Sequence, residues 1–369
     1  MKEMLEELHS PELSQALLRE VFTLADAFTT RYNRKPVFME VCGSHTMALA
    51  RTGLKTRLKD HVTLVSGPGC PVCVTDQKSI DSMIALAEGE NRIICTFGDM
   101  MRVPGSRKTL MDAKTEGKDI RVVYSPTDAI GIAERNPERE VIFLGIGFET
   151  TIPILAVVLK EADERKLSNF SMWVTTKLIE PIMRHLLDSD EVKLDGFLLP
   201  GHVSMVLGAE QFQYLPREYG IAGVISGFEP VQLVGGIYRL LELALNEKAD
   251  IVNELASIVS DQGNKVTQRL METYFTPCTE EWRGIGSIPD SGLAIRKQYR
   301  HLDAKLKFDV PNIEVRATKC RCGEVIRGLI SPPQCRLFGA ACTPLQPVGP
   351  CMVSTEGTCA AYYAYTRED

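Results

Sequence analysis

The chain has 369 residues, 44% hydrophobic and 24% charged, which is typical of a globular protein too long for one hydrophobic core, so we expect two or three domains. Its 42 basic and 48 acidic residues give a net charge of −6, and no long basic run indicates nucleic-acid binding. The acidic N-terminus lacks a signal-peptide core and no apolar run approaches the roughly 20 residues that span a bilayer, so we expect a cytoplasmic protein that does not bind membranes.

Helical periodicity predicts an opening helix over residues 11–32. Short apolar runs then recur at spacings of about 21 to 31 residues, which suit parallel strands joined by crossover helices. The runs are apolar throughout, as a sheet covered on both faces requires. We therefore predict an α/β protein with two parallel-sheet domains, residues 1–138 and 139–276, and a small Cys-rich iron–sulfur domain, residues 277–369, in which the strand rhythm is lost. The predicted strands are 37–41, 62–66, 92–97, 120–124, 141–146, 171–176, 196–200 and 222–226.

Gly-rich loops with unusual polar residues follow these strands. Ligands bind beyond the carboxyl ends of parallel strands, so we expect the loops to line one or two facing clefts. In CGSHT (42–46), Cys42 and His45 are candidates to bind one metal or to share a proton. Five further loop residues are secondary candidates, each with a competing role in capping or bracing its own loop: Asp99, Arg102, Glu149, His202 and Glu229.

The segment SGPGCPVC (66–73) places Cys70 and Cys73 three residues apart behind a turn of glycine and proline. Apolar residues at i, i+3, i+4 and i+7 from position 80 predict a helix soon afterwards. A helix N-terminus with proline in its first turn lowers the pKa of a thiol placed there. The segment thus predicts a reactive dithiol, with a pair of buried small residues as the alternative, whereas Cys95 and Cys278 are expected to be buried and inert.

The C-terminal segment KCRCGEVIRGLISPPQCRLFGAACTP (319–344) has the spacing C-x-C-x12-C-x6-C. Four thiolates can hold either a zinc ion or an iron–sulfur cluster. A zinc ribbon usually repeats C-x2-C knuckles, which are absent here, so we favour a [4Fe–4S] cluster. Cys351 and Cys359 either replace one of the chosen ligands or act as redox thiols near the cluster. The chosen ligands are Cys320, Cys322, Cys335 and Cys342.

Together with WRGIGSIPDSGL (282–293) and EGTCAAYY (356–363), these motifs resemble, in order, the HypD family of [NiFe]-hydrogenase maturation proteins. The resemblance implies a scaffold on which iron acquires carbon monoxide and cyanide before transfer to the hydrogenase large subunit. It also implies a [4Fe–4S] centre, a HypC-type chaperone as partner and a HypE-type protein as cyanide donor. By this resemblance Cys42, assisted by His45, holds the iron, Cys70 and Cys73 form a redox dithiol, and the four tail cysteines bind the cluster.

Two functions remain open at this point. The first is a redox-active assembly scaffold, which is not a conventional turnover enzyme. The second is an iron–sulfur-dependent thiol-disulfide reductase, in which Cys42 is incidental. The two differ in whether the Cys42 thiol is essential.

Overall fold

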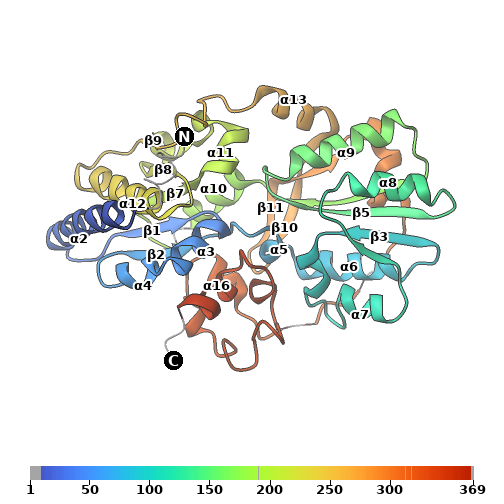
Figure 1. Cartoon of the computed structure of the whole chain (residues 1–369), viewed down its shortest axis with the longest axis horizontal. Helices are drawn as coiled ribbons and strands as arrows, with labels where there is room; N and C mark the ends of the chain where they lie inside the picture. Colours follow the sequence, from blue (N-terminus) through green and yellow to red (C-terminus); the bar gives the residue numbers. More distant parts are fainter. Residues whose placement is uncertain (1–9, 190, 312, 317, 367–369) are drawn as a thin grey trace.

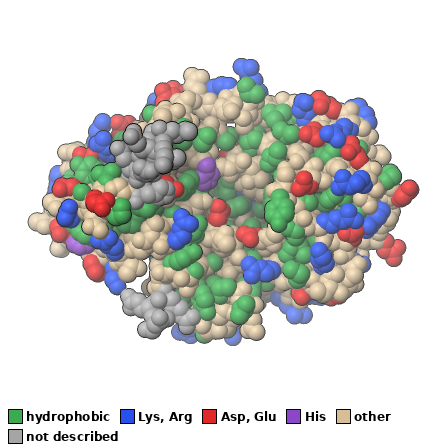
Figure 2. Space-filling view, viewed as in Figure 1, with side chains coloured by type: hydrophobic (Ala, Val, Ile, Leu, Met, Phe, Trp, Pro, Cys, Tyr) green, Lys and Arg blue, Asp and Glu red, His purple; other side chains and the backbone are tan. Residues whose placement is uncertain are grey.

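The computed structural model describes residues 10–189, 191–311, 313–316 and 318–366. Two parallel sheets lie side by side, each covered by helices, and the C-terminal region packs below the junction between them (Figure 1). On the face shown in Figure 2, acidic and basic side chains are interspersed, without a continuous basic stripe. None of the helices in the described part of the chain combines the length and apolar composition needed to cross a bilayer.

The opening helix α2 (Pro11–Tyr32) has the bounds that the sequence predicts. Its first turn is fixed by Pro11 and by Ser10, whose hydroxyl accepts a hydrogen bond from the Leu13 amide at 3.2 Å. Leu18, Val21, Ala25 and Phe28 form its buried stripe, which packs against helix α12 (Pro230–Leu245).

The first sheet has five parallel strands in the order β2-β1-β7-β8-β9. The second sheet has four parallel strands in the order β4-β3-β5-β6. All eight predicted strands are present, and the short strand β9 is additional. The bounds are β1 Val37–Glu40, β2 Thr63–Ser66, β3 Arg92–Thr96, β4 Ile120–Val122, β5 Glu140–Gly147, β6 Phe170–Thr176, β7 Gly196–Pro200, β8 Ala222–Ser226 and β9 Ile251–Asn253.

Strand pairing does not follow the expected boundary between residues 138 and 139. That boundary falls inside the second sheet, where β3 pairs with β5. The chain instead starts the first sheet with β1 and β2, builds the whole second sheet, and returns to complete the first. Spacing alone cannot reveal this order, because a crossover to a neighbouring strand and one to another sheet leave similar sequence patterns.

Fifteen α-helices and several 3-10 segments accompany these strands in the described residues, and they vary widely in length. The further α-helices are α3 Gly43–Arg51, α4 Leu54–Leu58, α5 Pro71–Val74, α6 Gln77–Glu88, α7 Leu110–Thr115, α8 Asp128–Arg135, α9 Ile152–Glu164, α10 Ile179–Ser189, α11 Gly201–Leu207, α13 Lys265–Tyr274, α14 Ala304–Lys307, α15 Cys322–Ile326 and α16 Thr358–Tyr365.

The region after residue 274 contains a long antiparallel hairpin, which the sequence pattern does not predict. Strand β10 (Phe275–Trp282) pairs with β11 (Gly286–Ile295). The hairpin is anchored to the second sheet by the fully buried Lys177, whose ammonium donates to Glu280 at 2.6 Å. Pro277, Pro289 and several glycines obscured the strand pattern, since these residues usually interrupt strands.

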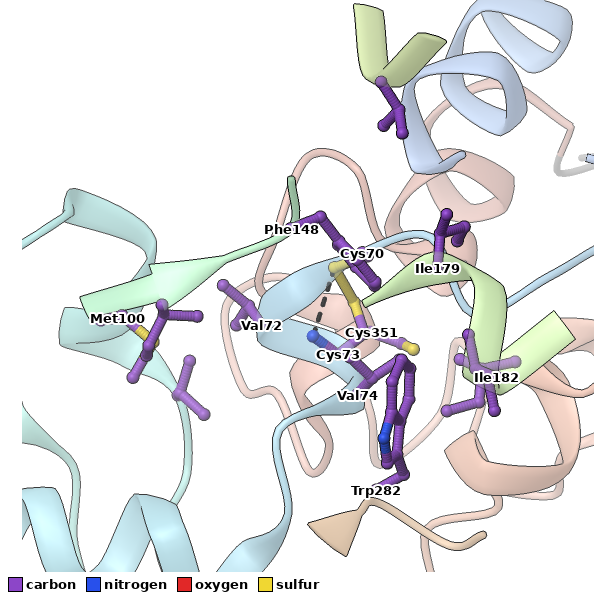
Figure 3. Close-up of a cluster of buried hydrophobic side chains, with 14 of the residues drawn as sticks. Cys70, Val72, Cys73, Val74, Met100, Phe148, Ile179, Ile182, Trp282 and Cys351 are labelled. Carbon is purple, nitrogen blue, oxygen red and sulfur yellow. Dashed lines mark hydrogen bonds between the residues drawn. A yellow bond between two sulfur atoms is a disulfide. The ribbon is translucent and has the colours of Figure 1, made fainter. Parts of the chain in front are cut away.

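One hydrophobic cluster joins the two sheets and the C-terminal region. Figure 3 shows Val72, Phe148, Ile179 and Trp282 around the Cys70–Cys73 pair. The segment that carries this pair is the first crossover from one sheet to the other, between β2 and β3. The dithiol therefore lies at the junction of all three parts of the molecule.

Candidate functional site

A small cavity of about 130 Å³ lies where the carboxyl ends of strands from both sheets meet. Cys42 and His202 follow strands of the first sheet, and Thr150 follows β5 of the second. Pro71 of the crossover and Glu356 of the C-terminal region complete the wall. The loops after β1, β2, β5 and β7 thus line a common cavity as expected, whereas the loops that carry Asp99, Arg102 and Glu229 do not line it.

Cys42 is the N-cap of helix α3, and its sulfur accepts a hydrogen bond from the Ser44 amide at 3.3 Å. The side chain is only 5% exposed. Burial, with a smaller contribution from the Glu356 carboxylate, raises the pKa of the Cys42 thiol to about 11. In the free protein the thiol is thus protonated at neutral pH, and binding a metal would require loss of that proton.

The imidazole nearest to this thiol belongs to His202, not to His45. The His202 Nε2 atom lies 3.6 Å from the Cys42 sulfur. The His45 ring is fully buried and packs against Phe228. Its Nε2 atom lies 3.1 Å from the Gly227 carbonyl oxygen. Burial lowers the pKa of His45 to about 4, so its ring stays neutral near pH 7. The structure therefore assigns His45 a contact with the loop after β8, and His202 the contact with the thiol.

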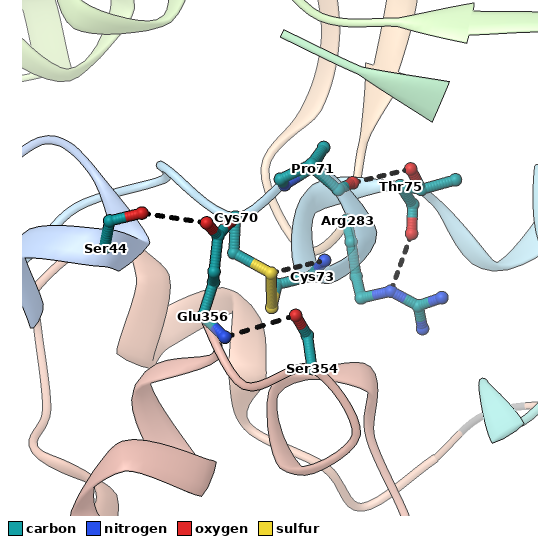
Figure 4. The surroundings of a disulfide bond; sticks show 8 residues. All are labelled: Ser44, Cys70, Pro71, Cys73, Thr75, Arg283, Ser354 and Glu356. Carbon is teal, nitrogen blue, oxygen red and sulfur yellow. Dashed lines mark hydrogen bonds between the residues drawn. A yellow bond between two sulfur atoms is a disulfide. The ribbon is translucent and has the colours of Figure 1, made fainter. Parts of the chain in front are cut away.

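Cys70 and Cys73 are joined by a disulfide (Figure 4). Cys70 is the N-cap of the single-turn helix α5. Its sulfur accepts a hydrogen bond from the Cys73 amide at 3.2 Å. Both side chains are buried, because the crossover packs between the sheets and the C-terminal region. A Cβ atom on Gly69 would lie 2.4 Å from the Cys42 Cα atom, so only glycine lets the crossover approach Cys42 this closely.

After reduction, Cys70 should react with iodoacetamide at least about tenfold faster than Cys95, because an N-cap position favours the thiolate. Cys95 is fully buried, and burial raises its pKa to about 12. Cys278 is half-buried, not buried as the sequence suggested, so it is the stricter comparison. Peptide mass spectrometry of protein labelled with and without prior reduction gives the rates. Equal labelling of Cys70 and Cys95 in the reduced native protein would contradict a tuned dithiol.

Glu356 is a site residue that is not among the candidates predicted from the sequence. Its carboxylate accepts a hydrogen bond from the Ser44 hydroxyl at 2.8 Å, and it lines the Cys42 cavity. Burial raises its pKa, and Asp99 adds to this increase. The signal that could have found it is the EGTC motif (356–359), an acid three residues before a cysteine in the C-terminal region. Gly43 is required here, since a Cβ atom would lie 2.4 Å from the Glu356 carbonyl oxygen.

Two of the secondary candidates make structural contacts. The Arg102 guanidinium donates to the Val353 carbonyl at 3.2 Å and holds the second sheet against the C-terminal region. Glu229 caps helix α12 in a reciprocal arrangement with Gln232. The competing roles that we considered for these residues, bracing and capping, account for both.

Glu149 is 3% exposed and lines a different, larger cavity. One carboxyl oxygen accepts a hydrogen bond from the Ile179 amide at 2.8 Å. The other has no partner among the described residues. Burial raises the pKa of Glu149 to about 7.

This shift predicts that Glu149 makes folding less favourable as pH rises. Between the unfolded pKa of 4.5 and about 7, the unfolded chain loses the proton while the folded chain keeps it. Stability should fall by up to about 3 kcal/mol across that window and not change further above it. Glu149→Gln removes the titration, so its melting temperature relative to wild type should rise from pH 5 to pH 8. Parallel melting-temperature profiles for the two proteins would contradict the assignment.

The six tail cysteines all belong to the C-terminal region, which packs below the junction of the two sheets (Figure 1). The thiols of Cys320 and Cys322 interact, as do those of Cys351 and Cys359. Cys322 and Cys351 belong to the same hydrophobic cluster as the disulfide, and Figure 3 shows Cys351 beside it. Among the described residues, no group of three or more His, Cys, Asp or Glu side chains is arranged so that it could hold a metal ion. In number and softness, the sulfur donors nevertheless suit an iron–sulfur cluster.

A protein-family model named HypD and described as the hydrogenase formation hypA family matches residues 13–366. The chain belongs to the HypD family. The hydrogenase maturation factor HypD of Rhodobacter capsulatus is 42% identical over 97% of both chains. The HypD factor of Cupriavidus necator is also 42% identical, over 98% of this chain and 97% of its own length. That of Escherichia coli is 38% identical over 99% and 98%. The chain is thus a hydrogenase maturation factor, as its motifs imply.

Proposed function

We propose that this chain is the redox-active scaffold on which iron acquires cyanide and carbon monoxide before it passes to the hydrogenase large subunit. A HypC-type chaperone and a HypE-type cyanide donor would be its partners, in the cytoplasm. The observation that carries the proposal is the Cys42 thiol, set beside His202 in a cavity that the disulfide-bearing crossover also lines.

Cys42 is suited to hold the iron because a thiolate is a soft donor, as low-spin iron with diatomic ligands prefers. The thiol must lose its proton when the metal binds. The His202 Nε2 atom lies 3.6 Å from the sulfur, and burial, which lowers the pKa of His202, favours the neutral ring that can accept that proton. The half-buried Glu356 carboxyl is a second acceptor on the same wall.

The size of the cavity supports a small inorganic substrate. At about 130 Å³ it is well below the roughly 300 Å³ at which pockets for organic ligands begin. Its wall combines backbone and side chains from both sheets, the crossover and the tail. This arrangement would shield iron and its diatomic ligands from water on several sides.

We further propose that four of the tail thiolates hold a [4Fe–4S] cluster, the set favoured by spacing being Cys320, Cys322, Cys335 and Cys342. When bound, such a cluster would supply single electrons. The chain would place the cluster close to the disulfide, because two tail segments contact helix α5, which carries Cys73. These segments are α15 and the 3-10 segment Pro350–Met352. This contact also favours the second candidate function, a thiol-disulfide reductase acting on the Cys70–Cys73 pair.

The experiment that tests the scaffold is isolation of the chain, under anaerobic conditions, from cells that also produce a HypC-type chaperone and a HypE-type protein. Iron should copurify with the two-protein complex, and infrared spectra should show bands of metal-bound cyanide and carbon monoxide. A complex that contains the tail cluster but shows no such bands, from cells with active hydrogenase, would refute the scaffold.

A further inference from the structure

A second cavity, of about 640 Å³, lies between helices α10 and α13 and the β10–β11 hairpin. Its volume is within the range of pockets that bind small organic molecules. Its walls are mainly apolar and come from several elements, which is typical of ligand sites formed between packed units. The apolar wall residues include Leu178, Pro181, Met271, Phe275, Ile288 and Leu293.

The buried carboxyl group of Glu149 forms part of this wall. Ile179 satisfies one of its oxygens, whereas the other lacks a partner within the described residues. A buried polar atom left without a hydrogen bond is costly. A ligand in the cavity that donates a hydrogen bond to this oxygen would remove that cost.

The charges around the cavity indicate which kind of donor fits. The guanidinium of Arg184 is already paired with Glu180 and Glu218, and the Arg296 Nε donates to backbone carbonyls. Apart from Glu149, four carboxylates line the cavity against these two guanidiniums and the His185 ring. The excess of negative charge favours a cation over an anion. The four carboxylates belong to Glu180, Asp188, Glu272 and Asp290.

We propose that this cavity binds a small organic cation, an alkyl chain carrying a protonated amine. The ammonium group pairs with Glu149, and the alkyl chain lies along the apolar walls. This inference does not depend on the proposed scaffold function. The two cavities are nevertheless adjacent in the chain, because residues next to Glu149 line the Cys42 cavity. These residues are Phe148, Thr150 and Thr151.

The test uses three probes of one length, hexylamine, hexanol and hexanoate, with binding to the purified full chain measured by calorimetry at pH 8. Hexylamine should bind at least about tenfold more tightly than either of the others, as expected for a charge-assisted hydrogen bond. Binding of hexanol with equal affinity, or no binding of hexylamine at 10 mM or so, would overturn the proposal.

Variants then locate the site. Glu149→Gln keeps the shape of the side chain and should weaken hexylamine binding at least about tenfold, with little effect on hexanol. The matched control is Glu90→Gln, a change of the same chemistry at an exposed position that does not line the cavity. Unchanged hexylamine affinity in a folded Glu149→Gln protein would show that the amine binds elsewhere and would overturn the assignment.

Discussion

Replacing Cys42 with serine should abolish the infrared bands of iron-bound cyanide and carbon monoxide on the complex with the HypC-type chaperone, and reduce hydrogenase activity in cells to background. A neutral hydroxyl lacks the soft, charged donor that this iron requires. The fold should persist, because the Cys42 sulfur accepts one amide hydrogen bond and serine can accept the same bond. The tail cluster should persist as well, since Cys42 follows β1 of the first sheet and is not one of the cysteines proposed to hold the cluster.

The matched control for this variant is Cys95→Ser, which also changes a buried cysteine but lies in β3 and lines no part of the Cys42 cavity. It should retain the bands and the activity. The reductase function predicts instead that Cys42→Ser still cycles the Cys70–Cys73 disulfide and supports maturation. Normal hydrogenase activity in cells whose only copy carries Cys42→Ser would therefore rule out the scaffold as assigned.

The strands could be predicted from sequence because a strand buried on both faces is a local signal. Runs such as 141–146 are apolar throughout, and all eight of the predicted runs form strands. Which sheet each strand joins is not a local property. It depends on a crossover whose rigid residues, Gly67 to Pro71, also carry part of the chemistry, so the placement of β3 in a second sheet became visible only in the structure.

The loops that form the candidate site could likewise be predicted from the sequence, whereas the contacts between their side chains could not. The rule that ligands bind beyond the carboxyl ends of parallel strands brought Cys42 and His202 to one cleft. The choice between two imidazoles depended on side-chain direction, and nearness in sequence favoured His45 although His202 contacts the thiol. Glu356 comes from a segment more than 300 residues later, and contacts of such separation leave no periodic trace.

The anaerobically purified protein should be brown and contain about four irons per chain, as a [4Fe–4S] site requires. Single alanine variants of the six tail cysteines should then divide into two classes. The four variants at the favoured ligands should lose most of the iron and the visible absorption. The variants at Cys351 and Cys359 should retain both. The favoured ligands are Cys320, Cys322, Cys335 and Cys342.

The tail should also loosen in the variants that lose iron, because its described part has only short helical segments and few strand contacts of its own. Limited proteolysis after residue 318 would show this. Cys278→Ala is the matched control, since Cys278 is a half-buried cysteine of the hairpin outside the tail, and it should keep iron and protease resistance.

If the Cys359 variant loses iron and the Cys322 variant keeps it, then Cys359 is a cluster ligand in place of Cys322. Cys322 would then be a free thiol in the same buried cluster as Cys351 and the disulfide. Zinc in place of iron under strict anaerobiosis would instead exclude a cluster, and the tail would then be a structural zinc site with no electrons to supply.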